Sequence, residues 1–215
     1  MKLGCLGCLG VLIVGLVIAG LLAGILWAWV AIMREPDLIP SSPMRADPGA
    51  VGRRLAEVRM RESGLSARGE PLTFSEAEAA AFLAQYLGEA GIHLSPVSVS
   101  FRSARMTTQG QLPLRALLQG PPLKWASGAV PRRGLDAPVW ITFTATVRID
   151  PAQGPHRARY AETILVETEI GRLPVPGWLL TLMLGPRGAS LLRWQVPAIV
   201  ERVDIGDGKL TIRTR

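Results

Sequence analysis

The sequence predicts an α+β fold, in which one N-terminal transmembrane helix precedes a domain of antiparallel, curved β-sheet packed against one or two helices. Three observations lead to this class: an uncharged apolar run over 3–33, a well-capped helix from residue 75, and strand-like alternation through most of the remainder. The chain has 215 residues, room for one domain beside the anchor. We expect an anchor over 1–34, a linker over 35–46 and a domain over 47–215.

The N-terminal run is long enough to cross a bilayer. No residue from Leu3 to Met33 is charged. A helix of this length measures roughly 45 Å, whereas the hydrocarbon core of a bilayer is about 30 Å thick. The run is about twice as long as the apolar region of a cleaved signal peptide, which favours a retained signal anchor. Trp27 and Trp29 near its end are typical of a membrane interface.

Small residues form a stripe on this helix. Gly20, Gly24 and Ala28 fall at successive i+4 positions, so they share one face and would let another helix approach closely. They are our candidates for a helix–helix contact. The plainer explanation is that glycine and alanine are common in membrane helices.

Two helices are expected after the proline-rich linker. The first begins at Asp47 or Pro48 and ends near Glu62, and its apolar stripe is thin. The second begins with Ser75 and Glu78, a capping box in which each side chain bonds to the other's backbone amide. Its apolar face is predicted to contain Ala79, Phe82, Leu83, Tyr86 and Leu87.

Strands are expected from the alternation that follows. The segment 97–101 should pair with 106–114 after a turn near Gln109 and Gly110, and the clearest strand, 139–149, should pair with 160–170. A closing hairpin over 198–213 turns around the Gly-Asp-Gly sequence at 206–208. The proline- and glycine-rich segment 120–138 is predicted to be a long loop.

An apolar stretch over 173–184 is too short to cross a bilayer. One interpretation is a short buried helix with Pro176 near its start. The other is an apolar groove or a membrane-contacting surface. The candidate lining residues are Trp178, Leu179, Leu182, Met183, Ile141 and Phe143.

No catalytic centre is predicted. The histidines, His93 and His156, show no spacing that ties them to a serine, a cysteine or a metal-ligand cluster. The cysteines, Cys5 and Cys8, lie inside the predicted anchor, so a disulfide scaffold is excluded and no metal site is expected. The net charge is +7, but basic and acidic residues alternate rather than forming the patch typical of nucleic-acid binding. We therefore expect no enzyme activity, no cofactor and no nucleic-acid partner.

Three passages resemble a known family. Leu-Thr-Phe-Ser-Glu at 72–76 opens a helix, Ile-Gly-Arg-Leu-Pro-Val-Pro at 170–176 ends a strand, and Ile-Gly-Asp-Gly-Lys-Leu-Thr-Ile at 205–212 forms the last hairpin. In this order they are similar to the YpmS-like and LmeA-like membrane-anchored envelope proteins. The resemblance covers roughly 70–215 and implies an extracytoplasmic domain with a curved sheet wrapped on a long helix, binding phospholipid or other lipids. The arginine content and the loop over 120–138 depart from the family.

Orientation depends on this resemblance. Arginines after the anchor, beginning with Arg34, favour a cytoplasmic domain, but long domains are often translocated despite their charge. The resemblance favours the periplasmic face of a bacterial cytoplasmic (inner) membrane, with a single-pass anchor.

Two functions agree with these features. The first is a membrane-anchored, non-enzymatic envelope module that binds lipid, with the bilayer and a phospholipid ligand as partners. The second is an accessory or scaffold subunit held in a larger membrane complex through its transmembrane helix, with other transmembrane subunits as partners. Lipid bound to the domain would support the first function. A contact between the small-residue stripe and another transmembrane helix would support the second.

Overall fold

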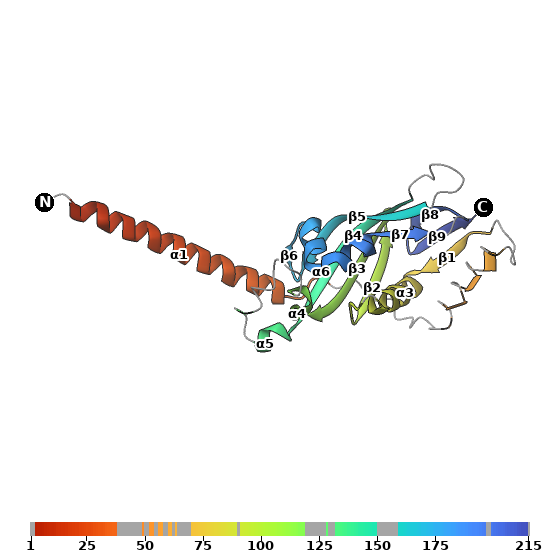
Figure 1. The fold of residues 1–215 in the computed structure, drawn as a ribbon, viewed down its shortest axis with the longest axis horizontal. Helices are drawn as coiled ribbons and strands as arrows, with labels where there is room; N and C mark the ends of the chain where they lie inside the picture. The colour runs from red at the N-terminus through yellow and green to blue at the C-terminus, as the bar shows by residue number, and fades with distance from the viewer. Residues whose placement is uncertain are drawn as a thin grey trace.

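The chain folds as one long helix joined to a domain of two antiparallel sheets (Figure 1). Helix α1, Leu3–Met33, projects from one end of the domain, and the C-terminus lies at the opposite end. The structure is a computed structural model. It describes residues 3–37, 70–89, 91–118, 132–149, 159–196 and 199–214, with Gly128 and separate positions between 49 and 63. The predicted α+β class with an N-terminal apolar helix and antiparallel sheets is confirmed, and the predicted curvature stays a prediction.

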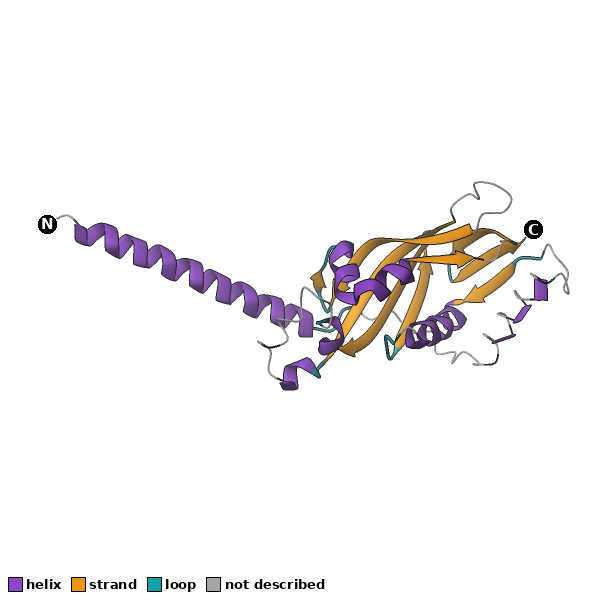
Figure 2. Ribbon diagram, in the orientation of Figure 1, coloured by secondary structure: helices purple, strands orange, loops and turns teal. Residues whose placement is uncertain are grey.

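The larger sheet contains five strands in sequence order, with a sixth on one edge. The five are β2 (Val97–Arg102), β3 (Arg105–Pro113), β4 (Pro138–Ile149), β5 (Arg159–Ile170) and β6 (Leu173–Pro174). The sixth, β7 (Arg193–Val196), pairs with the first residues of β5, while β6 pairs with its last residues. Since β4 occupies the other edge of β5, β6 and β7 share one edge, and helix α6 (Gly177–Leu192) joins them (Figure 2).

The smaller sheet has the order β1-β9-β8. Its strands are β1 (Leu72–Ser75), β8 (Val200–Gly206) and β9 (Lys209–Thr214). The hairpin predicted around 206–208 is confirmed, and Gly208 adopts a positive φ of 72° in its turn. The backbone N–H of Gly208 donates to the carbonyl of Phe101 at 3.0 Å, so this turn links the small sheet to the edge strand of the large one.

Helix α3, Glu76–Glu89, begins where the capping box predicts. The backbone N–H of Glu78 donates to Ser75 Oγ at 3.3 Å, and the backbone N–H of Ser75 donates to Glu78 Oε2 at 2.9 Å. The predicted apolar face is only partly correct. Leu87 is buried, but Phe82 is 38 % exposed, because its ring stacks on Tyr86 at the surface, with 6.1 Å between the ring centroids, instead of entering the core.

Removing the Ser75 hydroxyl tests the cap. We expect Ser75→Ala to lower the free energy of unfolding by about 1 kcal/mol, because the Glu78 amide loses its acceptor and the Glu78 carboxylate loses the hydroxyl that donates to it. Ser75→Thr is the matched control: its hydroxyl can still accept from the Glu78 amide and donate to the Glu78 carboxylate, so most of the stability should remain. Chemical unfolding followed by circular dichroism measures both. Equal losses in the two variants would contradict the cap.

The first hairpin turns earlier than predicted. The prediction of a turn near Gln109 and Gly110 is wrong, because both residues lie inside β3, paired with Ser98 and Val97 of β2. The turn is instead at Ser103 and Ala104, with positive φ values of 50° and 60°. Two consecutive positive φ angles match the twist of a tight hairpin but usually require Asn or Gly, so the Ser-Ala pair carries no recognisable turn signal.

The core lies on one face of the large sheet. On β4, Val139, Ile141 and Ala145 are buried on this face, whereas the other face carries mainly threonine. Helix α4 (Leu114–Leu117) and α6 cover the apolar face. The helices and the sheet together form a buried cluster of Leu112, Leu114, Leu117, Val139, Ile141, Ile170, Val175, Leu180 and Met183.

Other predicted elements lie mostly outside the described residues. The described positions between 49 and 61 are helical, in agreement with the first predicted helix. Of the predicted loop over 120–138, the structure describes Gly128 and the residues from 132 onward, which include the short helix α5 (Arg132–Leu135) and the start of β4.

Candidate functional site

Within the described part of the chain, one helix is long and apolar enough to cross a membrane. The segment Ile13–Met33 of α1 has a mean hydropathy of 2.4, and none of its qualifying window is buried in the domain. This assignment uses length and composition alone. Gly20 and Gly24 have open space around them, and Ala28 is half-buried. The small-residue stripe of α1 is therefore largely uncovered within this chain.

The end of α1 is built into the domain. Ala31 is 8 % exposed, and Trp29, Ile32 and Met33 pack against the buried cluster beneath α6. Residues 35–37, predicted as part of a linker, lie against the polar face of the large sheet, and Pro36 is buried. The helix thus continues directly into packed structure.

The turn between β5 and β6 holds the C-terminal end of α1. Gly171, at φ +61°, donates its N–H to the carbonyl of Trp140 at 2.8 Å. The next N–H, from Arg172, donates to the carbonyl of Ala31 at 2.9 Å. The last carbonyls of a helix have no partner within it, so this bond supplies one from the sheet. A Cβ at position 171 would collide with the carbonyl of Ile32. Only glycine therefore lets the β5–β6 turn approach the end of α1 this closely.

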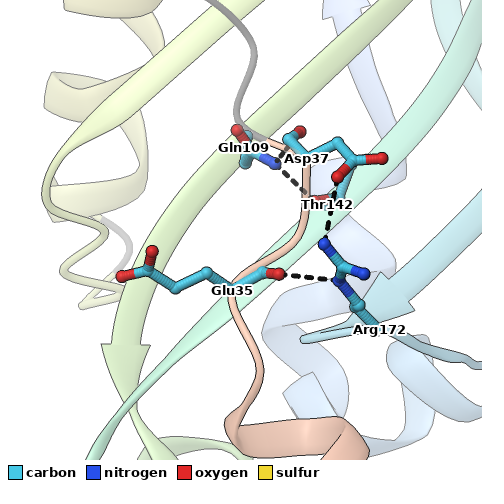
Figure 3. Close-up of polar contacts among 5 residues, drawn as sticks. All are labelled: Glu35, Asp37, Gln109, Thr142 and Arg172. Carbon is cyan, nitrogen blue, oxygen red and sulfur yellow. Dashed lines mark hydrogen bonds and ion pairs between the residues drawn. The ribbon is translucent and has the colours of Figure 1, made fainter.

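The Arg172 side chain secures the residues that follow α1. Figure 3 shows its guanidinium pointing to the main chain of Glu35 and the carboxylate of Asp37. Arg172 Nε donates to the carbonyl of Glu35 at 2.9 Å, and Nη2 donates to Asp37 Oδ1 at 3.1 Å. The Asp37 side chain is fully exposed, so this ion pair adds little stability and mainly sets geometry.

A buried amide completes the junction. Gln109, 1 % exposed, donates from Nε2 to the Asp37 carbonyl at 3.3 Å and to Thr142 Oγ1 at 3.1 Å (Figure 3). A buried side-chain amide needs hydrogen-bond partners, and the Asp37 carbonyl supplies one of them from the segment that follows α1. We call the contacts of Gly171, Arg172 and Gln109 with residues 31–37 the anchor junction.

Two recesses lie at opposite ends of the domain. One, of about 260 Å³, sits at the anchor junction and is lined by Pro36, Asp37, Gln109, Thr142, Glu169 and Arg172. The other, of about 460 Å³, lies between the end of β4 and β8, over 147–149 and 201–205. Both have charged side chains in their walls, so neither is the apolar cavity that an acyl chain would require.

The apolar-groove candidates separate into two groups. Ile141, Met183, Phe143 and Leu179 belong to the buried cluster or pack against it. Trp178 and Leu182 point the other way, with exposed fractions of 69 % and 42 %. The sheet and α6 thus bring the first group together under the helix and leave the second group on its outer side.

Two hydroxyls lie inside the apolar face without partners. Thr108 and Thr168 flank Phe143 in register across β3, β4 and β5. Both threonines are at most 4 % exposed, and neither Oγ1 has a hydrogen-bond partner among the described residues. Buried polar groups usually have a partner, so these hydroxyls are sites at which a ligand or water could bind.

The described residues contain no arrangement of three or more His, Cys, Asp or Glu side chains that could hold a metal ion. His93 is exposed, and His156 lies outside the described residues. The expectations of no catalysis and no cofactor stay predictions. The sequence reasoning missed the anchor junction, although Gly171 and Arg172 lie in the distinctive 170–176 passage. A glycine directly after a strand was the available signal.

No protein-family model, curated protein or solved structure matches this chain. The resemblance to the YpmS-like and LmeA-like proteins therefore stays a prediction. The class defined by fold and site is an α+β domain packed against the end of a helix long enough to span a membrane.

Proposed function

We propose that this chain is a single-pass membrane protein whose extracytoplasmic, non-enzymatic domain acts as an accessory or scaffold subunit, mounted on the cytoplasmic membrane of a bacterium. The anchor junction carries this proposal. Because the last turn of α1 packs into the core and bonds to the β5–β6 turn, the helix and the domain form one unit. A partner that binds α1 in the membrane would therefore also set the position of the domain.

The small-residue stripe of α1 is the surface for such a partner. Gly20 and Gly24 have nothing within 4 Å of an added Cβ, so a second helix can approach the backbone there. We expect Gly24→Leu to reduce recovery of the complex about tenfold, since a leucine would separate the two backbones. Native electrophoresis after gentle detergent extraction measures this recovery.

Gly15→Leu is the matched control for this experiment. Gly15 has the same open surroundings but lies nine residues from Gly24, which is two and a half turns and therefore the opposite face. The complex should survive this change. If the chain always migrates alone, or if both leucines act alike, the proposal of a helix-mediated assembly is wrong. A periplasm-active reporter fused after Arg215 tests the outward orientation separately.

Lipid binding is the second candidate, and the unpartnered hydroxyls of Thr108 and Thr168 favour it. They lie on an apolar sheet face that α6 covers with Leu180 and Met183. A lipid would have to displace α6 to reach this face. Full-length protein in nanodiscs containing a phospholipid with a photoreactive acyl chain tests this. Crosslinks to Phe143 or Leu179 would support lipid binding, whereas crosslinks confined to α1 would refute it.

A further inference from the structure

Helix α6 begins at the end of the domain where α1 enters. Strand β6 contacts α1, and α6 starts three residues after β6 ends. Figure 1 shows the first turn of α6 at this end. A Cβ on Gly177 would lie 3.2 Å from Leu165 Cβ, so this turn packs closely on β5. Its opposite side faces away from the sheet.

That outer side presents a tryptophan and a leucine. Trp178 is 69 % exposed, and Leu182, one turn later, is 42 % exposed, so the two form one apolar surface. Neighbouring residues on the inner side, Leu180 and Met183, are buried. Packing within the domain therefore does not account for the exposed pair.

We propose that Trp178 and Leu182 enter the interfacial layer of the bilayer that α1 crosses. The anchor junction holds the domain against the end of α1, so no free linker lifts this surface from the membrane. Trp27, 63 % exposed near the end of α1, marks the expected level of the interface, where indole rings concentrate. Two points of contact would fix the rotation of the domain about the anchor axis. This inference rests on the membrane anchoring proposed above, but not on any lipid-binding or scaffold role.

Site-specific fluorescence tests the contact. In full-length protein carrying Cys5→Ser and Cys8→Ser, Trp178→Cys is labelled with an environment-sensitive nitrobenzoxadiazole dye and reconstituted in phosphatidylcholine nanodiscs. Phe82→Cys is the matched control, an exposed aromatic position on α3. We expect nitroxide-labelled lipid to quench the dye at 178 about threefold more strongly than at 82, and aqueous iodide to show the reverse order. Leu182→Cys provides an independent second position.

Two results would overturn the proposed membrane contact of Trp178 and Leu182. A dye at 178 that is as accessible to iodide as the dye at 82 overturns the membrane contact. A dye at 178 shielded from both quenchers also overturns it, because a second copy or another protein then covers this surface. Carbonate extraction of native membranes is a separate check: release of the chain would refute the anchor itself, whereas a retained chain with an aqueous 178 refutes only the second contact.

Discussion

Gly171→Val is expected to lower the free energy of unfolding of the full-length chain by about 3–5 kcal/mol. Two costs combine. Valine is strained at φ +61°, and its Cβ would lie 2.5 Å from the Ala31 carbonyl and collide with that of Ile32. The β5–β6 turn must then move away from α1, which also breaks the bond from Arg172 N–H to Ala31. Denaturant unfolding in detergent, followed by circular dichroism, measures the loss.

Gly208→Val separates the two costs. Gly208 also has a positive φ, 72°, but an added Cβ there meets nothing within 4 Å. Its loss should be about 1–2 kcal/mol, the backbone strain alone. The difference between the two variants measures the contact with α1. Similar losses at both glycines would mean that the turn does not hold the helix, and the anchor junction would lose its role in the proposed function.

Arg61→Met is expected to cost about 2–3 kcal/mol. The Arg61 side chain is 4 % exposed and forms an ion pair with Glu57 at 2.6 Å. It also donates to the carbonyl of Glu70 and, at 3.3 Å, to Thr214 Oγ1. It thereby joins the helical positions near 60 to the end of β9. Methionine fills similar space but can make none of these hydrogen bonds. Thermal unfolding of the detergent-solubilised protein measures the loss.

Arg202→Met is the control for a surface ion pair. Arg202 contacts Asp204 at 2.5 Å, but its side chain is 72 % exposed. Water competes for such a pair, so the change should be within about 1 kcal/mol. If Arg61→Met were as mild as Arg202→Met, the buried network would not hold this part of the chain to the small sheet.

Local patterns were sufficient for most elements of the fold. The capping box of Ser75 and Glu78 marks the start of α3 because its hydrogen bonds join residues three apart. Alternation predicts β4 and β5 because one face of each is buried. The hairpin over 200–214 follows from its glycine turn. Each of these signals involves neighbouring residues, so a single sequence contains it.

Other features required contacts between distant segments. Whether Phe82 is buried depends on where β2 packs against α3, and helical periodicity alone places it on the wrong side. The Ser103–Ala104 turn depends on the pairing of β2 with β3, since neither residue favours a positive φ. Of the predicted apolar-groove residues, only Trp178 and Leu182 are left outside, because α6 docks on the sheet through its other side.

Helix α1 has one property that its own sequence determines and another that depends on contacts with distant segments. Its apolar length is a property of consecutive residues, so the sequence alone identifies a helix long enough to cross a bilayer. The attachment of this helix to the domain is not a property of consecutive residues. That attachment joins Ala31 to Arg172 and Asp37 to Gln109, residues from widely separated parts of the chain. Only folding of the sheet brings them together, because pairing of β3, β4 and β5 creates the surface on which the end of α1 is held.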